Sequence, residues 1–164
     1  MFDLSELERA HQIVGQAVPP TPAHAWPLLA ERLGTQVVVK HENHTPIGAF
    51  KVRGGLTYLD RLKREEPGVP GIISATRGNH GQSLAFAASR AGIPATIYVP
   101  HGNSVEKNRA MCAFGAKLVE HRPEYACASP SRWADVKTIS SQLRSDVAGV
   151  GCFERGFVAT IRVG

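Results

Sequence analysis

The sequence is poor in cysteine and contains no long apolar run. Its 164 residues include three cysteines, Cys112, Cys127 and Cys152, and none of them forms a CxxC pair. So sparse a set argues against a disulfide framework or a cysteine-rich zinc site and is typical of a reducing compartment. No apolar stretch approaches the length that spans a bilayer, and the N-terminus lacks the apolar core of a signal peptide. We therefore expect a cytoplasmic protein without a membrane partner.

Runs of one charge are also missing. The formal net charge is +5, but lysine and arginine are spread along the chain, and two glutamates follow the densest spot at Lys63 and Arg64. We interpret the excess as a solvated basic surface and expect no nucleic-acid partner, although mild positive charge suits an anionic ligand.

Several ligand-binding motifs are absent. No GxGxxG follows a predicted strand, and Gly54 and Gly55 lack the spacing of a phosphate-binding loop. His41 and His44 have HxxH spacing, but they lie on a predicted loop without further metal-binding residues nearby. The sequence therefore predicts neither a dinucleotide site nor a metal site.

Helical and extended patterns alternate along most of the chain. Residues 4–15 have helical spacing, with Ser5 and Glu8 as a possible capping pair, and a short helix is expected at 26–33. The other elements expected are a buried strand at 36–40, then helices at 48–64, 78–90 and 104–114 that alternate with strands at 71–75, 95–99 and 117–120. This order predicts an α/β fold, a three-layer parallel sheet with helices on both faces, with Cys112 facing the core.

The last part of the chain differs in composition. All seven histidines precede residue 126, whereas two of the three cysteines follow it. Val136, Ile139 and Leu143 share one face of a predicted helix, and a strand is expected at 157–163. We expect residues 126–164 to form a divergent tail, and a reading-frame shift is our hypothesis for its origin.

Lys51 follows a predicted strand and stands near the start of a predicted helix. The partial positive charge of a helix N-terminus disfavours a second cation, and Schiff-base chemistry requires a neutral amine. A solvated lysine on an amphipathic helix remains the alternative on chemical grounds alone.

The residues around Lys51 resemble the cofactor-lysine motif of fold-type II enzymes that use pyridoxal 5′-phosphate (PLP), the serine/threonine dehydratase family among them. The motif reads K-x-E-N-x-x-x-x-G-[SA]-F-K-x-R-G and is met by Lys40, Glu42, Asn43, Gly48, Phe50, Lys51, Arg53 and Gly54, with Ala49 where many members have serine. The resemblance implies that Lys51 is the catalytic residue, bonds to the cofactor and later moves the α-proton. It also implies that Phe50 packs beside the cofactor ring.

A second segment, 74–82, is similar to the S-x-G-N-H-[AG]-Q loop of the same family. The resemblance implies that Asn79 contacts the 3′-oxygen of PLP. It also implies a substrate-carboxylate site made by Thr76, Arg77, Gly78, Asn79 and His80. Whether Arg77 binds the carboxylate or points to solvent stays open, and His80 is expected to pack or orient the loop rather than carry protons.

The family resemblance covers residues 1–125 and implies an ammonia-lyase that converts L-threonine or L-serine to a 2-oxo acid and ammonia. Full-length members are expected to be homo-oligomers. We find no glycine-rich loop for the cofactor phosphate and expect the C-terminal phosphate-binding part to be absent, as in a truncated dehydratase. The alternatives are a non-catalytic α/β remnant and a PLP-dependent racemase or β-replacement enzyme.

Overall fold

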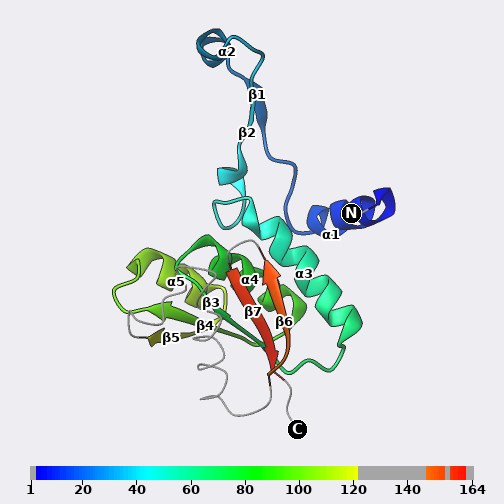
Figure 1. The fold of residues 1–164 in the computed structure, drawn as a ribbon, viewed down its shortest axis with the longest axis vertical. Coiled ribbons are helices and arrows are strands. Elements are labelled where there is room, and N and C mark those ends of the chain that lie inside the picture. The colour runs from blue at the N-terminus through cyan, green and yellow to red at the C-terminus, as the bar shows by residue number, and fades with distance from the viewer. Residues whose placement is uncertain (1–2, 122–146, 154–155, 162–164) are drawn as a thin grey trace.

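The computed structural model describes residues 3–121, 147–153 and 156–161 (Figure 1). The helices are α1 (Leu4–Gly15), α2 (Pro27–Leu33), the 3-10 turn η1 (Glu42–His44), α3 (Lys51–Glu65), α4 (Asn79–Ala91) and α5 (Val105–Ala113). The strands are β1 (Ala23–Ala25), β2 (Val38–Lys40), β3 (Ile72–Ala75), β4 (Ala95–Pro100), β5 (Lys117–His121), β6 (Val147–Phe153) and β7 (Gly156–Ile161).

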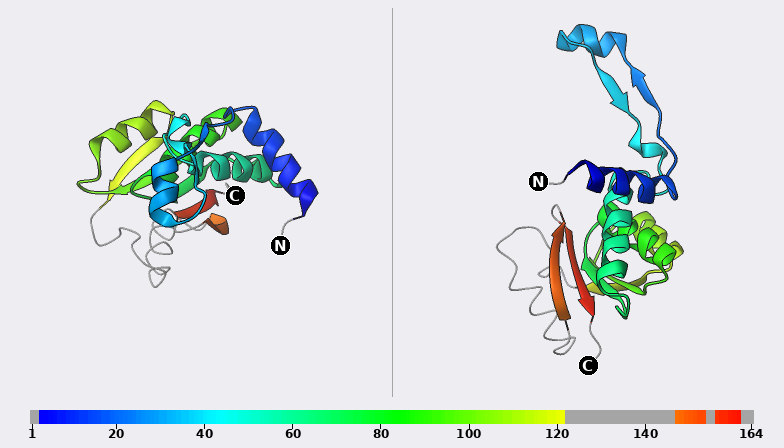
Figure 2. Two further views of the ribbon diagram at one scale, coloured as in Figure 1. Left: turned by 90° about the horizontal axis from the view of Figure 1, so that it is seen from above. Right: turned by 90° about the vertical axis from the view of Figure 1, so that its right-hand side faces the viewer.

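The main sheet has five strands in the order β5-β4-β3-β7-β6. Strands β3, β4 and β5 are parallel, and α4 and α5 connect them as the alternating pattern predicted. Strand β7 confirms the strand expected near the C-terminal end of the sequence, and it pairs antiparallel with β3, Ala75 opposite Phe157. Helices α3, α4 and α5 lie on the same side of this sheet (Figure 2). The α/β fold is confirmed, and the described residues supply one helical layer.

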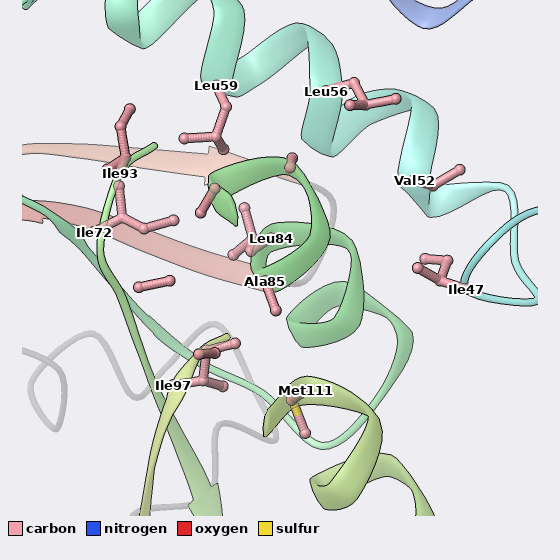
Figure 3. Packing of buried hydrophobic residues seen from close by; sticks show 14 of the residues in the cluster. Ile47, Val52, Leu56, Leu59, Ile72, Leu84, Ala85, Ile93, Ile97 and Met111 are labelled. Atoms are coloured by element: carbon pink, nitrogen blue, oxygen red, sulfur yellow. The ribbon is translucent and has the colours of Figure 1, made fainter. Parts of the chain in front are cut away.

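The core lies between α3, α4 and the sheet. Leu59 of α3 and Leu84 of α4 are 1% and 2% exposed, and Ile72 and Ile97 reach the same cluster from β3 and β4 (Figure 3). Met111 is fully buried on α5. Removal of this apolar surface from water holds α3 and α4 on the parallel strands that end at the candidate site.

Most predicted helix limits are confirmed to within one residue, and the exception is α3, which begins at Lys51 rather than at residue 48. Gly34 and Gly92 end α2 and α4 in left-handed conformations with φ of 65° and 71°. The predicted capping pair of Ser5 and Glu8 is wrong, because the capping box is formed by Asp3 and Glu6, each two residues earlier in the chain. Helical spacing marks the apolar face, but the cap depends on where the backbone leaves the extended conformation.

The prediction of a buried strand at 36–40 in the parallel sheet is wrong. Strand β2 pairs antiparallel with β1, Ala23 opposite Lys40, and the two form a separate sheet. Val38 is 68% exposed. The β1–α2–β2 segment extends away from the main sheet as an arm (Figure 1). A β-branched run favours extended backbone but does not select the strand with which it pairs.

The expectation that Cys112 faces the core is also wrong, because Cys112 is exposed. Its neighbour Met111 occupies the buried side of α5, and consecutive helical residues point about 100° apart. None of the described helices has the length and apolarity needed to cross a bilayer. The helical face predicted at Val136, Ile139 and Leu143 lies outside the described residues.

Candidate active site

Lys51 is the first residue of α3 and follows a tightly bonded loop. The Thr45 hydroxyl accepts a hydrogen bond from the Ala49 N–H at 2.9 Å. It also lies 2.9 Å and 3.0 Å from the carbonyl oxygens of Ala49 and Glu42, either of which can accept its proton. Gly48 adopts a left-handed φ of 65° in this turn, a conformation that favours glycine. These bonds fix the direction in which the chain enters α3 at Lys51.

An ion pair joins the two sides of the lysine motif. Arg53 donates to Glu42 through Nε at 2.7 Å and through an Nη at 2.9 Å, and the Thr21 hydroxyl donates to the same carboxylate at 2.6 Å. Hydrogen bonding from Arg53, assisted by Thr21, lowers the pKa of Glu42 to about 2. Glu42, before Lys51, and Arg53, after it, are therefore bonded to each other.

A second contact connects Lys51 with α4. The Ser83 hydroxyl donates to the Lys51 carbonyl at 2.6 Å, and Ser83 is 1% exposed. Gly55, one turn along α3, makes room for this contact, since a Cβ there would come within 2.2 Å of Ser83 Oγ. The lysine motif and the helix that begins at Asn79 thus meet in the interior.

The asparagine loop leaves β3 and enters α4. The Thr76 N–H donates to the Tyr98 carbonyl at 3.0 Å, which continues the pairing of β3 with β4. The Thr76 hydroxyl accepts from the Gly78 N–H at 3.3 Å. Asn79 is the first residue of α4 and is exposed, as is Arg77. The loop therefore lies where the chain passes from a parallel strand to a helix, the usual position for ligand contacts in such sheets.

The structure places the remaining predicted residues at the surface or half-buried. Phe50 stands at the N-cap of α3 and is 57% exposed. Gly78 and His80 are half-buried, and Thr76 contacts the first turn of α4, where a Cβ on Gly81 would lie 2.5 Å from its methyl carbon. Helix α4 is thus the common support of both motifs.

Lys107 reaches this loop, a neighbour that the sequence pattern did not identify. It lies in the first turns of α5, and its Nζ would be 3.0 Å from a Cβ built on Gly78. Among the residues that the structure describes, no carboxylate pairs with it. The sequence could have indicated this contact, because Lys107 lies on the helix after β4, at the same edge of the sheet as the asparagine loop. Lys107 adds positive charge beside the asparagine loop.

The histidines of the HxxH pair follow β2 and lie in an aromatic cluster with residues of the arm. The His41 ring centroid is 5.3 Å from that of His24 and 6.0 Å from those of Trp26 and His44. Within the described ranges, no group of three or more histidine, cysteine or acidic side chains is arranged to hold a metal ion.

Comparison with known proteins identifies the family. The family model described as "Pyridoxal-phosphate dependent enzyme" matches residues 14–150. The chain is 33% identical over 108 residues to the L-threo-3-hydroxyaspartate ammonia-lyase of Saccharomyces cerevisiae, covering 66% of this chain and 33% of that protein. It is 38% identical over 90 residues to the L-threonine ammonia-lyase of Geobacter sulfurreducens, covering 55% of this chain and 22% of that protein.

The fold is similar to that of a PLP-dependent aspartate racemase, with a TM-score of 0.72 and 27% identity over 87% of this chain and 44% of that one. The chain therefore spans about a third or less of the curated relatives that it matches and under half of this structural neighbour. The match over most of its length shows that the chain belongs to the pyridoxal-phosphate dependent enzyme family, in which it resembles the threonine and serine dehydratases.

Proposed function

We propose that this chain is the lysine-bearing part of a PLP-dependent ammonia-lyase that acts on L-threonine or L-serine. One observation carries the proposal. Lys51 opens α3, and its carbonyl is bonded to Ser83, one turn beyond Asn79 on α4. Two motifs from separate parts of the sequence are thus held together where the parallel strand β3 passes into α4.

The chemistry of the assembled groups fits PLP. Lys51 would supply a primary amine for the aldehyde, Asn79 a carboxamide for the ring oxygen, and Phe50, the residue before Lys51, an exposed aromatic ring. When bound, PLP supplies an electron sink that acidifies the Cα–H of an amino acid. The family and its ammonia-lyase members support this assignment.

The proposed roles follow from position. The Lys51 amine would hold PLP through its aldehyde, and Lys51 Nζ would accept the α-proton of the substrate. Backbone N–H groups and the hydroxyl of the loop from Thr76 to His80 bind the substrate carboxylate, and Arg77 adds a cation. Lys107 raises the positive potential at the same loop, which favours an anionic ligand.

Borohydride trapping tests the proposal. The purified chain is incubated with PLP, reduced and digested, and the pyridoxyl adducts are located by mass spectrometry. We expect one dominant adduct at Lys51, absent from the Lys51→Ala variant. Adducts scattered over the lysines, or none, would show instead that the chain is a non-catalytic remnant.

A racemase is the second candidate, since the fold is similar to that of an aspartate racemase. Incubation with L-threonine or L-serine distinguishes the two reactions, because a lyase releases ammonia whereas a racemase yields the D-amino acid.

We also propose that the chain acts in the cytoplasm, in keeping with its sparse cysteines, and self-associates. Size-exclusion chromatography with light scattering tests the last point.

A further inference from the structure

We propose that Ser83 is a positioning residue for Lys51, holding the cofactor lysine in register with Asn79. The inference rests on the proposed function, since it concerns the attachment of PLP at Lys51. It adds a residue that lies outside the lysine motif and acts from another helix. The hydrogen bond from Ser83 Oγ to the Lys51 carbonyl, 2.6 Å long, is its basis.

This hydrogen bond is unusual for a serine inside a helix. Such a hydroxyl commonly donates to the carbonyl four residues earlier in its own helix, which here would be that of Asn79. Ser83 donates instead across the interface to α3. A carbonyl oxygen has two lone pairs, so the Lys51 carbonyl can accept this bond and still take part in the hydrogen bonding of α3. The contact therefore ties α4 to the first residue of α3 without unwinding either helix.

The surrounding packing leaves little room for a different arrangement. Ser83 is 1% exposed and Val52, next to Lys51, is fully buried. A Cβ on Gly55 would come within 2.2 Å of Ser83 Oγ and 2.9 Å of its carbonyl oxygen. Gly55 and Ser83 are thus complementary, because Gly55 has no Cβ and the Ser83 hydroxyl occupies the space that such a Cβ would need.

The position of Ser83 on α4 relates the bond to the chemistry. Residues four apart lie on one face of a helix, so Ser83 and Asn79 share a face. A shift of α3 along α4 would move the Lys51 amine relative to the Asn79 carboxamide, and displacements near 1 Å cost on the order of a hundredfold in reactivity. The hydrogen bond from Ser83 opposes that shift at Lys51, the first residue of α3.

The test compares two lysines of the same helix in one reaction. Borohydride trapping with PLP gives the ratio of pyridoxyl adduct at Lys51 to that at Lys63, whose Nζ donates to the Ala91 carbonyl at the far end of α3. We expect Lys51 to dominate in the wild-type chain and the ratio to fall about tenfold in Ser83→Ala. Thr57→Val is the matched control, because within the described part of the chain the Thr57 hydroxyl bonds to carbonyls of its own helix, those of Arg53 and Gly54. Its ratio should stay within about twofold of the wild type.

Each outcome decides a separate point. A wild-type ratio near one overturns the proposed function, and the role of Ser83 with it. A high wild-type ratio that Ser83→Ala retains, or an equal fall in Thr57→Val, overturns the role of Ser83 alone. Circular dichroism establishes that each variant is folded. If Ser83→Ala fails to fold, Ser83→Cys replaces the hydroxyl with a much weaker donor, so the role requires the ratio to fall in that variant too, and an unchanged ratio overturns it.

Discussion

Glu42 and Arg53 form a two-point ion pair that links the residues before and after Lys51. Arg53 Nε and Nη lie 2.7 Å and 2.9 Å from the two carboxylate oxygens. The Glu42 side chain is 19% exposed and that of Arg53 31%. Because hydrogen bonding from Arg53 lowers the pKa of Glu42 to about 2, the carboxylate binds its partner charged over most of the accessible pH range.

The stability of the chain should depend on this pair below neutral pH. The pKa of the Glu42 carboxyl falls on folding from near 4.5 to about 2. Such a carboxylate stabilises the fold at pH values above its unfolded pKa, and this stabilisation is lost as the pH falls from the unfolded pKa to the folded one. We expect Glu42→Gln to lower the free energy of unfolding by about 1–3 kcal/mol at pH 7. The difference from wild type should shrink from pH 5 to pH 2 in urea titrations.

Arg53→Lys separates geometry from charge at the same pair. Lysine keeps the positive charge but cannot donate in the two-point geometry of a guanidinium. We expect a loss of about half that of Arg53→Ala, measured by the same urea titrations. Equal losses in both variants would argue that charge alone contributes nothing there.

The loop before Lys51 should resist a side chain at Gly48. Its φ of 65° is strained for any residue with a Cβ, although no atom lies within 4 Å of that Cβ. Gly48→Ala should cost about 1–2 kcal/mol, read as a lower midpoint of thermal unfolding. Gly68→Ala is the control, because Gly68 has equal space and no such φ. If both substitutions have the same effect, backbone conformation is not the cause.

Gly81 should be sensitive for a different reason. A Cβ there would lie 2.5 Å from both the Met111 sulfur and the Thr76 methyl carbon. Gly81→Ala should destabilise the chain by about 1–3 kcal/mol by forcing α4 away from α5 and the asparagine loop. Gly15→Ala, where nothing lies within 4 Å, should be neutral or slightly stabilising in the same denaturation experiment.

Leu59 tests the packing of α3 on the core. It is 1% exposed and faces α4 and Ile93 (Figure 3). Leu59→Ala should cost about 2–5 kcal/mol, because it leaves a cavity between α3 and α4. Leu28 lies on the arm and is 82% exposed, so Leu28→Ala should change the unfolding midpoint little. A large effect at Leu28 would mean that the arm is covered in solution.

The lysine motif was recognisable in the sequence, but the reasons for its residues were not. Gly48 and the charged pair Glu42 and Arg53 were identified by pattern alone, whereas the structure shows a left-handed turn and a two-point ion pair. The opposite charges of Glu42 and Arg53 within one motif were the feature of the sequence that could have predicted the ion pair. The roles of Lys51, Asn79 and the substrate loop stay predictions until trapping experiments test them, as does the divergent tail at 126–164.

The sequence by itself determined the helices α1 to α5 and the parallel strands β3, β4 and β5 in their order, whereas β1 and β6 were not predicted. The information lay in the spacing of the apolar residues and in the glycines that end helices. Helices α2 and α4 end at Gly34 and Gly92, and the strands at 72–75 and 95–100 are short apolar runs. Only the tertiary structure decided which strands pair, that β2 joins β1 rather than the main sheet, and that Ser83 reaches Lys51. Local patterns report backbone conformation, but pairing and contacts between helices depend on the shape of surfaces that form when distant segments meet.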